Sequence, residues 1–236
     1  KSAFFSFTIF SLILSKTIIV SCTEYPKTVR IAATNVGSMG GLLALQRGET
    51  HIAGTHLLDP DTGAYNIPDI KRTIPNLPVV LVHLAQREQG LIVRRGNPKK
   101  IASLKDLSRK DVTFINRQPG SGTRVLLDFE LRRLGIGPGA IRGYEREEFT
   151  HMAVGVAVVS DLADVGLGVR SAANALGLDF IPVGNEQYDL LFVRAFFESE
   201  KGEKLLHGVR SESFKKAVST LGGYDTRSTG EILYQQ

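Results

Sequence analysis

From residue 28 onward, short apolar runs rich in Val, Ile and Leu alternate with longer stretches in which apolar residues recur every three or four positions. Gly, Ser, Thr, Asn or Asp marks each junction. Short β-type runs alternating with helical periodicity are typical of an α/β fold. The predicted strands are 29–33, 52–54, 79–82, 90–93, 112–115, 163–168 and 189–193. The predicted helices are 39–47, 125–134, 152–160, 171–176 and a region at 203–221, together with one capped by Ser103.

Two polar junctions divide this pattern into lobes. Residues 85–89 separate two apolar runs, and residues 182–186 precede the return strand at 189–193. We interpret both junctions as crossings between lobes. The predicted first lobe is 1–87 together with 185–236, and the predicted second lobe is 88–184.

The N-terminal segment 3–20 is apolar except for Ser, Thr and Lys16. One interpretation is a secretory signal or membrane anchor that ends in the lipoprotein-like pattern 19–22, which would place the protein outside the cytoplasm, lipid-anchored through Cys22. The other is a pair of buried strands at 4–14 and 17–20 in a cytoplasmic protein. Lys16 counts against the first interpretation, because a charge inside an apolar span is costly. Both remain open.

Charge and composition favour an anionic ligand. Lys and Arg number 29 against 24 Asp and Glu, giving a net charge of +5, which attracts anions. There is no Trp and no basic run longer than two residues, so we expect no direct nucleic-acid binding. A single cysteine excludes an intramolecular disulfide, and the five histidines lack metal-ligand spacing. The sequence therefore predicts a small anion as partner, with no protein-bound metal and no cofactor.

Three junctions place small hydroxyl residues at the start of a predicted helix: 37–41, 120–124 and 149–151. A helix start exposes unpaired N–H groups and carries partial positive charge, so it binds anions. Each junction taken singly also fits an ordinary helix cap. In a doubly wound sheet, however, helix starts converge at the carboxyl ends of the strands. The residues that we predict to bind the anion are Ser38, Thr55, His56, Ser121, Gly122, Thr123, Arg124 and Thr150.

Enzyme and nucleotide-binding motifs are missing. The glycine-rich segments match neither GxxxxGK[ST] nor a dinucleotide fingerprint, and GxSxG is absent. Ser121, His151 and Asp164 have no local signature of a catalytic triad, and the acids at 145–148 are more typical of a solvated face. We therefore expect a binding protein and not an enzyme.

Several motifs occur in a characteristic order: NVGSMGGLLAL at 35–45, IAGTHLLD at 52–59, FINRQPGSGTRV at 114–125 and GYEREEFTH at 143–151. Together they resemble the periplasmic-binding-protein-like domain of the molybdate and tungstate group, which is also found fused to molybdopterin-synthesis proteins or helix-turn-helix regulators. The resemblance implies a two-lobed type II fold, with a mixed sheet flanked by helices in each lobe.

What the resemblance implies about function is binding of a tetrahedral oxyanion, molybdate or tungstate above all, in a cleft between the lobes. For transport the partner would be a membrane permease. The alternatives are an oxyanion-handling domain of molybdopterin synthesis and the sensing domain of a DNA-binding regulator. The first helix of the family has no match here. Either Ser21 contributes the first anion loop from a shortened start, or residues between Ser21 and Tyr25 are absent, so Ser21 is only a tentative ligand residue.

Two finer predictions concern the chemistry of the site. The three motif cores contain no carboxylate. Phosphate keeps a proton at neutral pH and needs an acceptor, so sulfate, molybdate and tungstate should bind better than phosphate. Arg124 should contribute charge to the ligand, although pairing with Asp128 one helical turn later is an alternative.

Overall fold

In the computed structural model, the structure describes residues 24–25, 28–29, 31–32 and 36–236. Ser21, Cys22 and the apolar segment with its two interpretations lie outside the described residues. The chain forms two compact units. Unit 1 comprises the described residues up to 86 together with 187–220 and 224–236, and unit 2 comprises 87–186 together with 221–223. The sequence placed the changes of lobe at 87/88 and 184/185.

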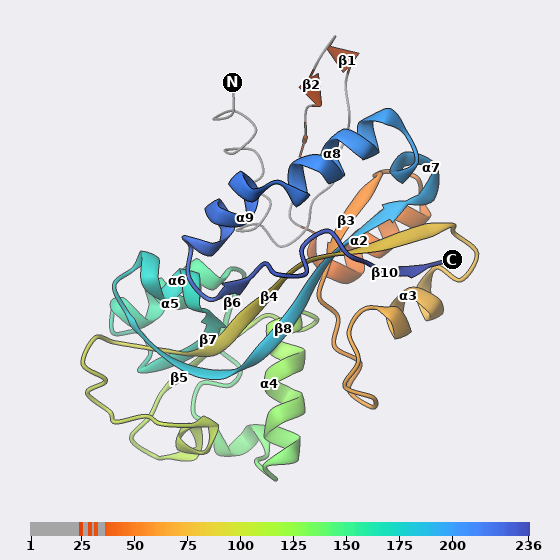
Figure 1. Cartoon of the computed structure of the whole chain (residues 1–236). Helices are drawn as coiled ribbons and strands as arrows, with labels where there is room; N and C mark the ends of the chain where they lie inside the picture. Colours follow the sequence, from red (N-terminus) through yellow and green to blue (C-terminus); the bar gives the residue numbers. More distant parts are fainter. Residues whose placement is uncertain (1–23, 26–27, 30, 33–35) are drawn as a thin grey trace. The chain divides into compact units, whose positions relative to one another are not determined.

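Unit 1 is built on strands β3 (Ile52–Thr55), β10 (Ile232–Gln235) and the adjoining parts of two long strands, β4 (Val79–Val93) and β8 (Asp179–Val193) (Figure 1). β3 pairs antiparallel with β8, so that Ile52 lies opposite Phe192 and Thr55 opposite Asp189. β10 pairs antiparallel with β4. Short strands β1 (Glu24–Tyr25), β2 (Thr28–Val29) and β9 (Tyr224–Asp225) complete the strands described in this unit.

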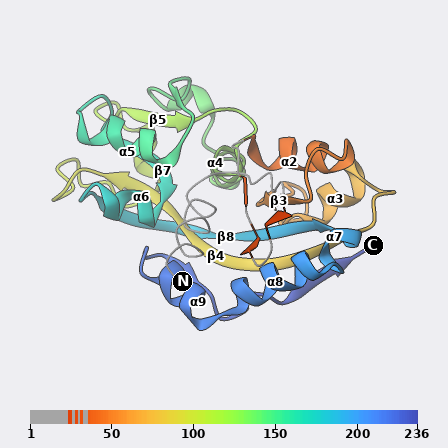
Figure 2. The ribbon, with the colours of Figure 1, turned by 90° about the horizontal axis from the view of Figure 1, so that it is seen from above.

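Helices cover both faces of this sheet. Figure 2 shows α2 (Gly37–Gln46) and α3 (Ile67–Thr73) on one side of β4 and β8, and α8 (Glu200–Arg210) and α9 (Glu212–Ser219) on the other. The short α7 (Arg194–Phe197) links β8 to α8. Leu42, Leu45 and Ile70 pack against Leu81 and Leu191 in a core that is almost fully buried. Burial of this apolar surface is the main stabilising contribution to the unit.

Unit 2 contains three neighbouring parallel strands, β5 (Phe114–Arg117), β6 (Glu147–Glu148) and β7 (Val165–Val169). β5 pairs in parallel with both β6 and β7, and β7 pairs antiparallel with β4. A helix follows each parallel strand: α4 (Gly122–Arg133), α5 (His151–Val159) and α6 (Arg170–Ala175). Two 3₁₀ helices, Leu104–Ser108 and Pro138–Ala140, fill connections.

The two faces of the unit 2 sheet have separate cores. Phe114 packs with Leu127 of α4, whereas the next residue, Ile115, packs with Val154 of α5. Successive side chains of a strand point to opposite faces, so α4 covers one face and α5 and α6 the other. This doubly wound arrangement confirms the predicted mixed α/β fold.

Some predicted elements are wrong in detail. The polar stretches 85–89 and 182–186 do not interrupt strands, because β4 and β8 each run unbroken through them (Figure 1). The helical region at 203–221 is two helices, since Ser211 ends α8 and caps α9. Ser103 and Asp106 form the expected capping box, but on a 3₁₀ helix. Of the strand predicted at 29–33, only part lies within the described residues.

Candidate functional site

Two of the three predicted helix starts lie side by side in unit 2. β5 and β6 are parallel neighbours, with Asn116 opposite Glu147 and Arg117 opposite Glu148. The loops after these strands therefore leave the same end of the sheet, and α4 and α5 begin there. Both helices direct their N-terminal N–H groups toward this end, and the partial positive charge of each helix start favours an anion there.

Each of these helices has a hydroxyl cap. Ser121 Oγ accepts a hydrogen bond from the Arg124 N–H at 3.2 Å, and Thr150 Oγ1 accepts one from the Ala153 N–H at 3.0 Å. Ser121 and the following Gly122 are buried, and Thr150 is exposed. A hydroxyl that accepts from the backbone keeps its hydrogen for another acceptor. Both caps are therefore able to donate to an anion.

Arg124 is held by acidic and aromatic neighbours. Its Nε lies 3.3 Å from Asp128, its Nη1 lies 3.4 Å from Glu147 Oε1, and its guanidinium lies 4.0 Å from the centre of the Tyr144 ring. Burial opposes the charge, but the hydrogen bond with Tyr144 and the charge of Asp128 raise the pKa of Arg124. The pairing with Asp128 that the sequence left as an alternative is present. Contact of Arg124 with a ligand stays a prediction.

Arg117, which sequence reasoning missed, is a second cation at this end of the sheet. It is 1% exposed. Its Nε donates to the Glu148 carbonyl at 2.9 Å, and its Nη2 donates to the Phe149 carbonyl at 2.8 Å. Burial lowers the pKa of Arg117 to about 10, with Glu186 and Glu148 opposing that shift, so the guanidinium remains charged at neutral pH. Arg117 thus fixes the loop that leads to α5 and adds positive charge beside it.

A row of buried polar side chains ends at α4, and sequence reasoning missed this row too. Arg87 forms an ion pair with Glu186, and both are almost fully buried. Glu186 Oε2 accepts from Gln89 Nε2 at 2.6 Å, and the same nitrogen lies 3.3 Å from Thr123 Oγ1 in the first turn of α4. We call Arg87, Glu186, Gln89 and Thr123 the polar row.

The third predicted helix start, α2, belongs to unit 1 and is built differently. Its N-cap residue, Val36, makes no side-chain cap, and Gly37 adopts a φ of +75°, a conformation that favours glycine. Ser38 is buried, and its Oγ accepts from the His56 N–H at 3.2 Å. The start of α2 is thereby tied to the residue after β3, and the Ser38 hydroxyl keeps a hydrogen to donate.

Thr55 and its neighbours form a closed buried network in unit 1. The Thr55 hydroxyl donates to Asn66 Oδ1 at 2.9 Å, and Asn66 Nδ2 donates to Asp189 Oδ2 at 2.7 Å. The other carboxylate oxygen of Asp189 lies 2.8 Å from His83 Nδ1. The ring of His56 packs edge-on against Tyr188. Thr55 therefore uses its hydroxyl hydrogen within the protein.

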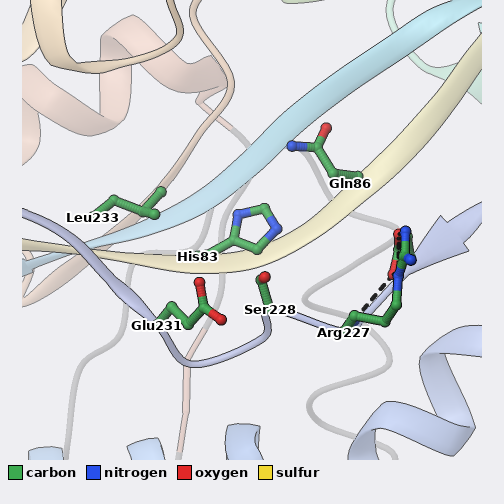
Figure 3. Close-up of a pocket in the computed structure, with 7 residues that line it drawn as sticks. His83, Gln86, Arg227, Ser228, Glu231 and Leu233 are labelled. Atoms are coloured by element: carbon green, nitrogen blue, oxygen red, sulfur yellow. Dashed lines mark hydrogen bonds and ion pairs between the residues drawn. The ribbon is translucent and has the colours of Figure 1, made fainter.

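A separate open pocket of about 450 Å³ lies in unit 1. Figure 3 shows labelled side chains from β4 and from the segment around β10 on its rim, including His83, Gln86 and Ser228. Asp225 also lines it, and hydrogen bonds from Arg227 lower the pKa of Asp225 to about 2. Of the predicted ligand residues that the structure describes, none lines this pocket.

Two further findings concern only the described part of the chain. Residues 24–25, 28–29, 31–32 and 36–236 hold no group of His, Cys, Asp and Glu arranged to bind a metal ion. Across these same residues, no helix combines the length and the apolar character that crossing a membrane requires.

A family model described as the PBP superfamily domain matches residues 22–210. The chain therefore belongs to this superfamily, and the predicted periplasmic-binding-protein-like fold is confirmed. Among curated relatives, YvgK of Bacillus subtilis (strain 168) is 40% identical over 203 residues, which are 84% of this chain and 64% of YvgK. The chain thus spans a little under two thirds of the length of that relative.

Solved structures with the same fold include transport proteins of three kinds. A tungstate ABC transporter protein from Geobacter sulfurreducens has a TM-score of 0.58 and 19% identity, over 79% of this chain and 83% of its own. The substrate-binding domain of a molybdenum ABC transporter from Clostridium difficile has a TM-score of 0.57 and 15% identity, over 95% of this chain and 92% of its own. A phosphate ABC transporter substrate-binding protein from Clostridium perfringens, with bound phosphate, has a TM-score of 0.56 and 14% identity, over 78% of this chain and 82% of its own. At these identities the similarity shows the fold alone.

Proposed function

We propose that the chain is a non-enzymatic binding protein for a small tetrahedral oxyanion. The observation that carries this proposal is the pair of helix starts in unit 2. Two helices begin side by side at one end of a sheet, each is capped by a hydroxyl that can still donate, and Arg117 adds a buried positive charge. Preorganised N–H and hydroxyl donors with a nearby cation suit a compact anion.

Donors from the chain hold the anion in this proposal. Ser121, Thr123 and Thr150 supply hydroxyl hydrogens, Gly122 lets the backbone approach closely, and Ser38 has the same donor geometry in unit 1. Molybdate and tungstate are the favoured ligands within this class, because the sequence motifs resemble that group. The oxyanion-binding proteins among the structures of the same fold support the ligand class.

Isothermal titration with molybdate, tungstate, sulfate and phosphate tests the proposal. We expect at least one of these to bind with a Kd below about 0.1 mM, equivalent to about 5.4 kcal/mol. Ser121→Ala should weaken binding about tenfold, because it removes a buried donor. Ser103→Ala is the matched control, since it removes a cap from a different helix of unit 2. Failure of all four anions to bind would refute the proposal.

For the biological role, we propose delivery of the anion to a membrane permease. Support comes from the transport proteins that share the fold, including those for tungstate and molybdenum. The handling of oxyanion in molybdopterin synthesis and the sensing domain of a regulator remain the alternatives. Deletion of the gene should lower molybdate uptake at low external concentration, and unchanged uptake would argue against transport.

A further inference from the structure

The hydrogen bonds of the polar row in unit 2 have a fixed direction, and that direction determines whether Thr123 donates to a ligand or accepts from it. We propose that Glu186 and Gln89 orient the Thr123 hydroxyl as a donor, so that the site selects oxyanions that carry no proton. Gln89 and Glu186 act here as positioning residues, and Thr123 is the group that contacts the ligand. This inference rests on the proposed oxyanion function and specifies which members of that class bind best.

The first step is the orientation of the Gln89 amide. Glu186 is 1% exposed, and its Oε1 is engaged by Arg87 while its Oε2 lies 2.6 Å from Gln89 Nε2. An ionised carboxylate can only accept hydrogen bonds. Gln89 must therefore present its NH₂ group to Glu186. The reverse orientation would place two oxygens in contact in a buried position, so the amide has one arrangement.

The second step carries this orientation to Thr123. The Gln89 nitrogen that donates to Glu186 also lies 3.3 Å from Thr123 Oγ1. An amide NH₂ has two hydrogens and no lone pair to offer, so Thr123 Oγ1 accepts the second hydrogen. The hydroxyl hydrogen of Thr123 is then left to donate elsewhere. Thr123 lies in the first turn of α4, where N–H groups and the helix dipole also favour negative charge.

The oxygen of Gln89 shows which neighbour fixes the amide. Gln89 is 0% exposed, and among the residues that the structure describes, its Oε1 has no hydrogen-bond partner. A buried acceptor without a partner reduces stability. No hydrogen bond to the Gln89 oxygen therefore stabilises this orientation of the amide. The hydrogen bond to Glu186 holds the amide in the orientation that makes Thr123 a donor, although the unpaired oxygen reduces stability.

The consequence is selectivity by protonation state. Around neutral pH, phosphate carries at least one proton and needs an acceptor, whereas sulfate, molybdate and tungstate carry none and need only donors. Glu186 is the buried carboxylate of the polar row, but its oxygens are occupied by Arg87 and Gln89. Thr123 faces the ligand as a donor. The row should therefore favour the unprotonated dianions.

Titrations of molybdate and phosphate on Gln89 and Thr123 variants test this inference. Gln89→Met keeps the side-chain length but removes both amide hydrogens, and we expect the ratio of molybdate to phosphate affinity to fall about 3- to 10-fold. Thr123→Val should lower molybdate affinity about tenfold, because it removes the donor itself. In the double variant, Gln89→Met should change the ratio less than about twofold, since Gln89 acts only through Thr123.

Two further variants keep the test independent of folding. Gln86→Met makes the same substitution on the same strand outside the polar row, and it should leave the ratio unchanged. Gln89→Glu places a second carboxylate against Glu186, so that the two share a proton. Thr123 can then donate to the introduced carboxylate and present its oxygen to the ligand, and phosphate should gain about 3- to 10-fold relative to molybdate. Circular dichroism and thermal unfolding identify any variant that fails to fold.

The possible results separate the two proposals. If the wild-type protein binds none of the anions, the proposed function is refuted and the selectivity inference with it. If the wild type binds molybdate but Gln89→Met and Gln89→Glu leave the ratio unchanged, the inference about the polar row alone is refuted. An undiminished effect of Gln89→Met in the Thr123→Val background would also refute it, because Gln89 would then act on the ligand by another route.

Discussion

Thr55 in unit 1 and Thr123 in unit 2 are both buried, at 0% and 1% exposure, but their hydroxyls are used in opposite directions. Thr55 donates to Asn66, which passes the chain of hydrogen bonds on to Asp189. Thr123 accepts from Gln89 and keeps its hydrogen. A buried polar network whose donors are paired contributes stability, whereas the remaining hydrogen of Thr123 is the one that we propose a ligand accepts. The same residue type therefore has different hydrogen-bonding directions in the two units.

The largest expected effect comes from opening the closed network of unit 1. Asn66 is fully buried, accepts from Thr55 and from the Leu57 N–H, donates to Asp189 and has a φ of +61°. Asn66→Ala should lower the free energy of unfolding by about 3 kcal/mol, because it leaves buried partners unpaired and strains the backbone. Chemical denaturation measures this loss. A loss below about 1 kcal/mol would mean that the network is not a stabilising unit.

Matched substitutions sharpen the comparison of the two threonines. Thr55→Val removes a donor from the closed network and should cost about 1 kcal/mol of stability, with less than about a twofold change in molybdate affinity. Thr123→Val should instead reduce the free energy of molybdate binding by more than it reduces the free energy of unfolding. Unfolding and titration on the same preparations check both halves. Equal effects of the two variants on affinity would contradict the contrast between the units.

Arg124 tests whether a charged residue of unit 2 serves the fold or the ligand. The dipole of α4 alone would make Arg124→Ala neutral or slightly stabilising. With Asp128, Glu147 and the Tyr144 ring in contact, the substitution should instead cost about 0.5–1 kcal/mol of stability. Thermal shifts with and without molybdate separate the roles. An equal ligand-induced shift in both proteins would remove Arg124 from the binding site.

The smallest effect concerns Asp225, in the pocket of unit 1. Its pKa is about 2 in the folded protein against an ordinary value of 3.8. Because the folded value is the lower one, the stabilisation is fully present above pH 3.8 and is lost as the pH falls toward 2. Asp225 and Arg227 are both substantially exposed, so solvent screening keeps the effect below about 1 kcal/mol. In Asp225→Asn, the free energy of unfolding, measured by chemical denaturation, should fall less below pH 3.8, by up to that amount. An unchanged pH dependence would contradict the assignment.

Local features of this chain were readable from its sequence. The caps at Ser121 and Thr150 bond to N–H groups three residues later, and the capping box of Ser103 and Asp106 spans the same distance. Such interactions depend on residues within one helical turn, so residue type and spacing suffice to predict them. The alternation of strand and helix periods likewise determined the α/β class.

Tertiary structure decided which polar groups meet. Arg87 and Glu186 are 99 residues apart, and Arg117 reaches carbonyls 31 and 32 residues away. No local pattern marks such partners. The polar stretch 85–89 looked like a break between strands, but β4 runs through it between its neighbours β8 and β7, and pairing with β7 begins at Gln89. Ladder hydrogen bonds and burial from distant segments outweigh the local preference for a loop.

The sequence thus identifies the hydroxyl residues at helix starts and strand ends as candidates for binding. It does not show the direction in which each hydroxyl donates its hydrogen. For Thr55 that direction depends on Asn66 and Asp189, and for Thr123 it depends on Gln89 and Glu186. A hydroxyl can donate or accept, and only its neighbours in space choose between the two. The sequence by itself determined the fold class and the residue types able to bind an anion. The packed structure determined which of those residues still have a hydrogen to give, because hydrogen-bond partners are brought together by folding and not by position in the chain.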